Sequence, residues 1–571
     1  MEQTEILQTA LFAMLPVLLT KITGQIFNLL AASSFGTKSV EYNQFILASS
    51  IPDLISNVLI LGSVGAVVIP TLISARKKEG EEAFLRLYNA ILNWSLLIFG
   101  VLSIIIFFFG DKFFPLYLSA FAGENYPTPE EMLTIVDYLR VLLLPQIILA
   151  ISVFVSNGIN IYNRYLVPQL SPLFFNFGRI FGLLFLIPVM GGQPSSWAIV
   201  IGVYIGAILH LLVQVPLARY LGLRYMMVFS FKGPYLGELL RISIPRMFAV
   251  ASEHIALTIN DAIAFGVKAA TSLNFANSLS LVVPQMFAFT FAYASFPKLS
   301  EHYEDKDYKG IVYIVNKTFN EMIFLALPFI VTLLIMRVPV VRLTFGLKTD
   351  TALDLDGTYQ IAWVLLWFAV GHVFVIGKWY MYRLYYATKE TLTPFLISLG
   401  SLVLNIVLAI VFTNLFSHNK EYAISATNIT MENLTTRGDG VAAVGGIALG
   451  MSVAYTIEFF ALIIVFNFTK FRLELGKLML SLIPKFIAAG AMFVTMYLMY
   501  KTWNVLYYAV PTSTANAYRG STTINLFILT LITVVTSFMV YYLVSHLLKM
   551  EELKILRRYL NPIFRLGGLR L

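Results

Sequence analysis

Charged side chains lie at mid-depth in several segments that are otherwise apolar enough to cross a membrane. Lys21 is at the centre of LFAMLPVLLTKITGQIFNLLAA, and Glu253 is at the centre of IPRMFAVASEHIALTINDAIAFG. A charge at the bilayer centre costs roughly 2.5 to 3.5 kcal/mol on insertion scales, so such side chains usually face water or a charged partner. The other charges of this kind are Asp53, Arg179, Arg246, Lys378, Glu458 and Lys485.

Lys21 is the strongest candidate for binding a ligand. Gly24 and Asn28 follow it at helical offsets of three and seven, so they share its stripe of the helix. If water reaches this face of the helix, its positive charge suits an anionic cargo. The alternative is a buried ion pair between Lys21 and a carboxylate, which only locks two helices together.

The segment around Glu253 offers groups for ion coupling. Glu253 and the adjacent His254 can each bind a proton, but neighbouring helical residues point about 100° apart, so we do not expect one dyad. Asp261 is a second ionisable candidate in the same segment. We expect coupling to sodium, protons or the membrane potential, without a bound cofactor or metal. Lysines and arginines nearer the segment ends can instead snorkel to the interface.

The composition places these residues in an integral membrane protein. The chain has 571 residues, of which 58% are hydrophobic and 12% charged, whereas soluble domains are about half apolar and a quarter charged. Fourteen apolar segments are long enough to span a bilayer. We therefore expect an all-α polytopic protein with about 14 transmembrane helices. The chain has no cysteine, which excludes disulfides, thiolate metal sites and cysteine nucleophiles.

Positive charge is concentrated in alternate loops. ARKKEG, PKLSEHYEDKDYKG and KFRLELGK are rich in Lys and Arg, as is the tail KMEELKILRRYL, which predicts that these loops and both termini are cytoplasmic. This topology explains the net charge of +9 better than nucleic-acid binding does, because the basic residues are dispersed without an aromatic platform. We expect the basic amphipathic tail, 549–571, to lie on anionic membrane lipids.

The segments around Lys21 and Glu253 begin an internal repeat. Each starts at a proline, Pro16 or Pro245, ends at Phe-Gly and is followed by a short loop and a helix with an internal proline. Because six helices separate the copies, they share an orientation, as in the parallel repeats of some transporters. The expected divisions are an N-lobe at 1–230, a C-lobe at 231–472 and helices 13 and 14 at 473–548.

Enzyme signatures are weak. The sequence has no Gly-rich phosphate loop and no HExxH zinc motif, and its one DLD triplet, Asp354 to Asp356, is interpreted as a solvated turn. A membrane glycosyltransferase needs carboxylates in a surface loop for acid–base or metal chemistry. The first outer loop, GTKSVEY, offers only Glu41. We therefore expect that the protein is not an enzyme.

Several motifs resemble those of the MurJ/MviN lipid II flippases. In order, they are SSIPDLISNVLILGSVGAVVIPTLISARKKEGEEA, NGINIYNRYLVPQLSPLFFNFGRI, FPKLSE, VVRLTFG and GKWYMYRLYYATKETLTP. The resemblance implies the multidrug/oligosaccharidyl-lipid/polysaccharide exporter fold, with two six-helix lobes around a cationic cavity. It also implies outward movement of a lipid-linked peptidoglycan precursor by alternating access. In this family helices 13 and 14 form a groove for the lipid tail.

The arginines that line the family's cavity are only partly kept. Matching positions read Lys21, where the charge is kept, and Phe27, Ser56 and Ser278, where it is lost. Asn43 stands where the family has an acidic residue. Because lysine lacks the bidentate fork of arginine, we expect Lys21 alone to bind a diphosphate more weakly.

The leading prediction is a monomeric flippase that moves a polyprenyl-diphosphate-linked, lipid II-like precursor from the inner to the outer leaflet of a bacterial cytoplasmic membrane. The residues expected to hold the diphosphate are Lys21, Arg246 and Lys378, and those expected to bond its sugar or peptide are Asn28, Asn43 and Asn277. Glu253 and Asp261 are the expected ion-coupling residues. The alternatives are a drug or cation antiporter of the same superfamily, which prefers an acidic cavity, and a membrane scaffold without transport.

Overall fold

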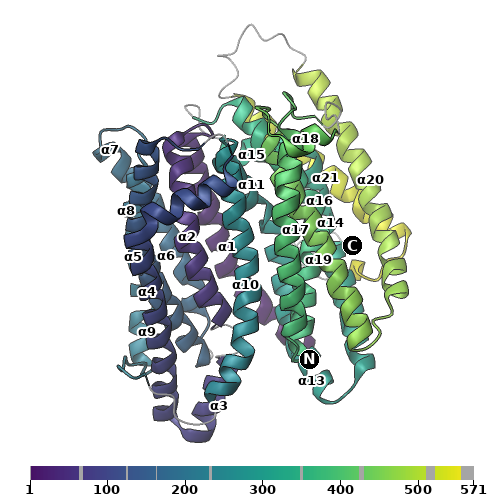
Figure 1. Cartoon of the computed structure of the whole chain (residues 1–571). Helices are drawn as coiled ribbons and strands as arrows, with labels where there is room; N and C mark the ends of the chain where they lie inside the picture. Colours follow the sequence, from purple (N-terminus) through teal and green to yellow (C-terminus); the bar gives the residue numbers. More distant parts are fainter. Residues whose placement is uncertain are drawn as a thin grey trace. The chain divides into compact units, whose positions relative to one another are not determined.

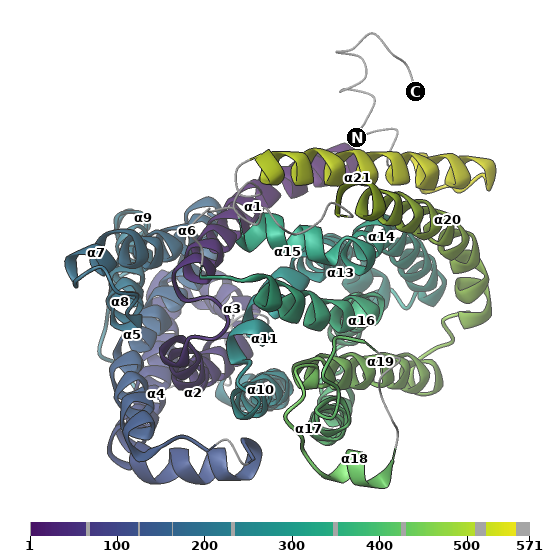
Figure 2. The same cartoon turned by 90° about the horizontal axis from the view of Figure 1, so that it is seen from above.

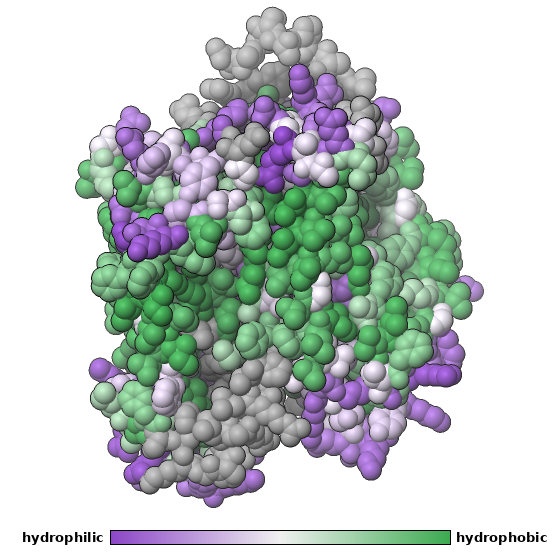
Figure 3. Space-filling model, viewed as in Figure 1, coloured by the Kyte–Doolittle hydropathy of each residue, from purple (hydrophilic) through white to green (hydrophobic). Residues whose placement is uncertain are grey.

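Helices make up all of the regular secondary structure in the part of the chain that the computed structural model describes. The described residues are 2–63, 69–123, 126–162, 164–229, 235–346, 352–423, 430–508 and 521–554. Ten helices in these ranges are long and apolar enough to cross a membrane. Figure 3 shows hydrophobic side chains over the middle of the helices and hydrophilic ones towards their ends. The prediction of an all-α polytopic membrane protein is confirmed.

All fourteen expected segments coincide with helices (Figure 1). The first six correspond to α1 (Glu2–Phe35), α2 (Val40–Ser63) with α3 (Ile69–Glu79), α4 (Glu81–Phe121), α5 (Pro129–Ile161), α6 (Leu166–Phe181) with η2 (Gly182–Leu186) and α7 (Ile187–Val189), and α8 (Ser196–Leu212) with α9 (Val215–Tyr220). The next six correspond to α10 (Tyr235–Gly266), the run from α11 (Ala270–Ser280) through α12 (Val282–Pro284) and η3 (Gln285–Phe289) to α13 (Thr290–Glu304), α14 (Tyr308–Ile335), α16 (Leu355–Ala387), α17 (Leu392–Phe416) and α19 (Ala443–Thr469). The last two are α20 (Leu475–Tyr508) and α21 (Ser521–Leu547), and the short helices α15 (Arg337–Phe345) and α18 (Met431–Thr435) lie in connections.

Helix ends follow local sequence signals. α1 ends before Gly36, whose φ of 65° suits glycine and whose N–H donates to Ala32 O at 2.9 Å. α5 begins with a capping box in which Thr128 and Glu131 satisfy each other's backbone N–H groups. In the segment around Met286, a π-helical stretch follows Pro284, as is common where proline removes a helical hydrogen bond.

The helices divide into two compact units that alternate along the chain. The first comprises Met1–Ala276, Asp350–Ile361 and Thr391–Ala454, and the second comprises Asn277–Thr349, Ala362–Glu390 and Tyr455–Leu571. These units follow side-chain packing, whereas the expected lobes follow the sequence repeat. The lobe boundaries at 1–230 and 231–472 therefore stay a prediction.

In the first unit, α6 packs closely against α8 through four glycines. Gly178, on α6, and Gly182, at the start of η2, are spaced by four residues, as are Gly202 and Gly206 on α8. A Cβ on Gly178 would lie 2.2 Å from the backbone nitrogen of Gly206, so the two backbones are in contact. Small residues at this spacing are typical of helix packing in membranes. On another side α6 packs against α1, and α10 packs against α2 and α17.

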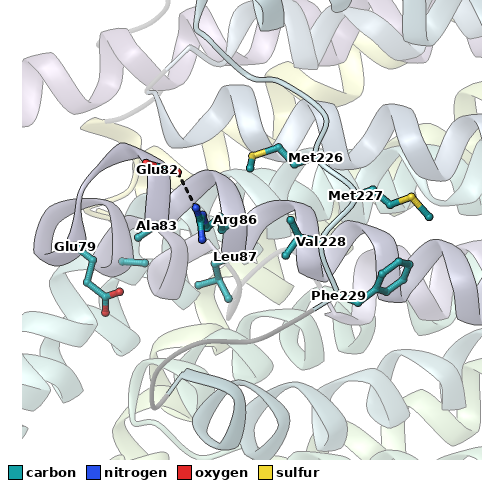
Figure 4. A pocket seen from close by; sticks show the side chains of 10 residues that line it. Glu79, Glu82, Ala83, Arg86, Leu87, Met226, Met227, Val228 and Phe229 are labelled. Carbon is teal, nitrogen blue, oxygen red and sulfur yellow. Dashed lines mark hydrogen bonds and ion pairs between the residues drawn. The ribbon is translucent and has the colours of Figure 1, made fainter.

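The extended segment 223–229, which follows α9, is fixed along α4 by side chains that bond its backbone. The side-chain amide of Asn89 donates to Arg224 O at 3.0 Å and accepts from the N–H of Met226 at 3.0 Å. Asn93 donates to Met226 O at 2.9 Å. A cavity of about 800 Å³ lies beside this segment and the α3–α4 junction (Figure 4). Arg86, which lines it, is paired with Glu82 at 2.9 Å, so its charge is already balanced.

In the second unit, α20 lies beside both α14 and α21 (Figure 2). The hydroxyl of Tyr541, on α21, donates to Phe324 O of α14 at 2.8 Å, and both side chains are buried. Ser481, on α20, donates to Asn320 Oδ1 of α14 at 2.8 Å. These contacts join the last two expected helices to the helices that precede them.

The glycine contact between α6 and α8 predicts that a large side chain lowers stability at these glycines and not at an exposed one. Gly206→Leu should lower the melting temperature of the purified protein, because a side chain would meet Phe175 O at 2.5 Å, and overpacking costs about 1–3 kcal/mol. Gly400→Leu is the matched control, since a Cβ there meets nothing within 4 Å. Equal melting temperatures for the two variants would contradict the close packing.

Candidate functional site

Helix α6 docks onto α1 around Lys21. The side-chain amide of Asn176 donates to Thr20 O at 3.0 Å and to Thr23 Oγ1 at 3.1 Å. A Cβ on Gly24 would lie 3.6 Å from the same amide, so a small residue leaves room for it. Lys21 is half-buried. Among the described residues no carboxylate lies within ion-pair distance of its ammonium, so the alternative of a locking pair finds no partner there.

Arg179 places a second cation on the same helix pair. It follows Asn176 by one turn of α6, and its guanidinium carbon lies 3.5 Å from the centre of the Phe27 ring of α1. The ring of Phe175 lies 5.6 Å away on α6. Phe27 is completely buried. The sequence identified Arg179 as an intramembrane charge but assigned it no role, because it does not reveal that α6 meets α1 at Phe27.

Asp53 is held by a short chain of hydrogen bonds. Gln146, on α5, donates to Asp53 Oδ1 and accepts from Ser56 Oγ at 2.8 Å. Ser56 is buried, whereas Asp53 is exposed. A carboxylate exposed to lipid at this depth is costly, so we infer that the exposed side of Asp53 faces water.

The charges near Asp53 interact over a distance. Asp53 interacts electrostatically with Arg179 of α6 and with Asp261 of α10. Within the described ranges none of these groups forms a direct ion pair with another. Asp261 also interacts electrostatically with Tyr117 of α4. The hydroxyl of Tyr117 donates to Thr258 O. The first unit thus combines unpaired cations and carboxylates from several helices.

The expected coupling residues both lie on α10. Glu253 and Asp261 are half-buried. Between them, Asn260 donates to Asn405 Oδ1 at 3.1 Å and joins α10 to α17. Arg246 also belongs to α10, but its side chain lies outside the described part of the chain.

Asn43, which is predicted to form hydrogen bonds with the cargo, links α2 to the start of α11 in this conformation. It is buried, its amide donates to Ser39 O at 2.7 Å, and its Oδ1 accepts from the N–H of Thr271 at 2.9 Å, at the start of α11. Asn28, on α1, and Asn277, on α11, are half-buried. The contacts of these three asparagines with a cargo stay predictions.

Lys378 forms a buried ion pair in the second unit. Its Nζ lies 3.2 Å from Glu458 Oε2, both side chains are at most 3% exposed, and the ammonium lies 3.6 Å from the centre of the Tyr455 ring. Tyr382 also donates to Glu458. The pair joins α16 to α19. This arrangement favours a structural role, and binding of the cargo by Lys378 stays a prediction.

Two other expected features also have local partners. Lys485, on α20, pairs with Glu552 at 2.9 Å; of the predicted tail, residues 555–571 lie outside the described residues. In the DLD triplet, Asp354 accepts from Lys38 at 2.8 Å and from the Gly357 N–H at 2.7 Å, at the start of α16. The hydrogen bond with Asp354 raises the pKa of Lys38. These exposed groups form a solvated turn, as predicted.

The helical fold defines a polytopic membrane protein with charged side chains inside its first unit, and comparisons with known proteins identify its family. The family model for the lipid II flippase MurJ matches residues 31–437. The chain therefore belongs to the MurJ lipid II flippase family.

Relatives and solved structures agree with this assignment. The chain is 26% identical over 544 residues to a probable lipid II flippase MurJ of Thermotoga maritima, covering 94% of this chain and 96% of the relative. It is 23% identical over 412 residues to the lipid II flippase MurJ of Burkholderia cenocepacia, covering 70% and 77%.

Among solved structures, lipid II flippase MurJ in an inward closed conformation superposes with a TM-score of 0.67 at 17% identity, covering 93% of this chain and 99% of that one. An inward-facing multidrug resistance MATE family transporter of the MOP superfamily superposes with a TM-score of 0.58 at 13% identity, covering 77% and 93%. Both likenesses concern the fold.

The Lys378–Glu458 pair predicts how its variants behave. Lys378→Met or Glu458→Gln alone should lower the melting temperature, because removing one partner of a buried pair costs about 3 to 5 kcal/mol. The double variant should recover part of the loss, since it leaves no unpaired charge. Thermal unfolding of the purified variants measures this. A stable Lys378→Met variant that loses transport would instead assign Lys378 to the cargo.

Proposed function

We propose that this chain moves a lipid II-like precursor, a cell-wall glycan linked to a polyprenyl diphosphate, from the inner to the outer leaflet by alternating access. The observation that carries the proposal is the match of the lipid II flippase family model to residues 31–437. The presence of half-buried Lys21 in α1 supports an anionic cargo. Because the family model is specific to flippases, neither a drug antiporter nor a scaffold is favoured.

The cargo's diphosphate is assigned to basic groups on the membrane helices. Lys21 is the first of these, since its ammonium has no carboxylate partner in the described ranges and a phosphate would satisfy it. Arg246 on α10 is the second proposed contact. Lys378 is a third only if its ion pair with Glu458 opens during transport. The uncharged contacts to sugar or peptide are assigned to Asn28, Asn43 and Asn277.

Transport is proposed to be driven by an ion or by the membrane potential. Glu253 and Asp261 are the assigned coupling groups because both are ionisable, half-buried and on α10. Intramembrane carboxylates of this kind commonly mark proton or cation pathways. Asp261 of α10 and Asp53 of α2 carry like charges and repel each other electrostatically.

The protein is assigned to a bacterial cytoplasmic membrane as a monomer, with both termini cytoplasmic and its basic tail on anionic lipids. The Lys/Arg bias of alternate loops supports this orientation. An external reading from a reporter fused after Lys309 would contradict it.

Replacement of Lys21 tests the proposed function directly. Lys21→Ala should abolish exposure of a labelled lipid-linked precursor on the outer leaflet of reconstituted vesicles, and Lys21→Arg should retain or improve it because arginine adds bidentate contacts. The melting temperature of both variants should stay near that of the parent. Full activity of a stable Lys21→Ala variant would contradict a binding role for Lys21. An unstable variant would indicate a structural role.

Replacement of Glu253 tests the coupling assignment. Glu253→Gln keeps the shape of the side chain but removes its charge and proton site, so transport should slow and lose its dependence on pH or sodium. The measurement is precursor exposure in vesicles under imposed proton and sodium gradients. An unchanged ion dependence would reassign Glu253 to structure.

A further inference from the structure

We propose that Arg179 binds the cargo's diphosphate together with Lys21, as two cationic contacts on the paired helices α1 and α6. The inference rests on the proposed function and deepens it, because it assigns a binding residue that lies in neither α1 nor α10. The two helices are joined at Asn176, one turn before Arg179, so the position of the guanidinium relative to α1 is set by direct contacts.

The hydrogen-bond donors of Arg179 have no acceptor in the described part of the chain. Its side chain is only partly exposed. A guanidinium carries five donors that are costly to leave unsatisfied in a membrane protein. Thr20 Oγ1, beside Lys21, is likewise buried without a described partner. Polar groups without a described hydrogen-bond partner therefore lie on both α1 and α6, which indicates a ligand that forms hydrogen bonds with them.

Two aromatic rings lie against the guanidinium of Arg179. Phe27 lies 3.5 Å from the guanidinium carbon and Phe175 lies 5.6 Å from it, so aromatic side chains flank the group. Stacking of this kind uses the face of the guanidinium and leaves its edge free for hydrogen bonds. That edge is the part that pairs with two phosphate oxygens at once. The contact with the aromatic rings therefore leaves the guanidinium N–H groups available to an anion.

Asp53 carries a charge opposite to that of Arg179. Asp53 balances Arg179 electrostatically without forming a direct ion pair with it, and Gln146 donates to the same carboxylate. The charge of Arg179 is thus partly compensated, while its N–H groups remain available for hydrogen bonds. A directly paired arginine, such as Arg86 with Glu82, has no such capacity.

The spacing suits a diphosphate. Lys21 and Phe27 are six residues apart on α1, which is about 9 Å along the helix axis. The two positions are also about 120° apart around the helix, so Lys21 and the guanidinium beside Phe27 are separated around α1 as well as along it. Both cationic side chains are long and flexible, and two linked phosphates span more of this separation than a single phosphate does.

Binding of short prenyl phosphates to the purified full-length protein tests the inference. Farnesyl diphosphate and farnesyl monophosphate serve as probes in calorimetric titrations of the parent, Arg179→Gln and Arg179→Lys. Loss of one charge-assisted contact should weaken diphosphate binding about tenfold or more, with a smaller effect on the monophosphate. Arg179→Lys should be intermediate, because it keeps the charge but loses the fork.

Arg140→Gln is the matched control, since Arg140 also lies on a membrane helix beside a phenylalanine but already donates to Phe107 O at 2.9 Å. Its diphosphate affinity should equal that of the parent. If Arg179→Gln does not fold, Phe27→Leu removes the stack and keeps the charge, and it should also weaken diphosphate binding. Melting temperatures accompany every titration.

The outcomes separate this inference from the proposed function. Parent-like diphosphate affinity in folded Arg179→Gln, or no binding of the diphosphate by the parent, would overturn the role of Arg179. Precursor exposure by the parent in vesicles tests flipping independently. A parent that binds the diphosphate through Arg179 but exposes no precursor would overturn the flippase assignment and leave the binding site standing.

Discussion

An ionised side chain inside a bilayer must have either a partner or water, and this constraint organises both units of the protein. The second unit uses a partner: Lys378 and Glu458 neutralise each other while buried among aromatic rings. The first unit leaves Lys21, Arg179 and Asp53 without direct ion pairs among the described residues. Since hydrocarbon would not tolerate that arrangement, the first unit is where we expect water and an anionic cargo to enter.

Close helix packing gives the cations of the first unit their positions. Gly178 and Gly182 bring the backbones of α6 and η2 into contact with that of α8, so a side chain at either position would clash. Asn176 then fixes α6 to α1 by bonding a backbone oxygen and a threonine hydroxyl. A binding site supported by rigid helices holds its charges in a defined geometry, which suits the binding of a charged cargo.

A cation from a neighbouring helix lies beside a position where the sequence resemblance implies an arginine. That position is Phe27, and the guanidinium of Arg179, on α6, lies over its ring. Asn43 and Ser56 differ from the family residues too, and both are used in hydrogen bonds between helices. The charge of a cavity is thus a property of packed helices, since a side chain from a neighbouring element can supply it.

The sequence by itself determined the all-α membrane class, the fourteen helical segments and the residues whose charge is costly in lipid, because hydrophobicity, segment length and charge are local properties. It also pointed to Lys21. Only the tertiary structure decided which charges are paired, since the partner of Lys378 lies 80 residues away on α19. It alone brought Arg179 over Phe27, because that contact depends on how α6 packs between α1 and α8, and periodicity along one helix contains no information about its neighbours.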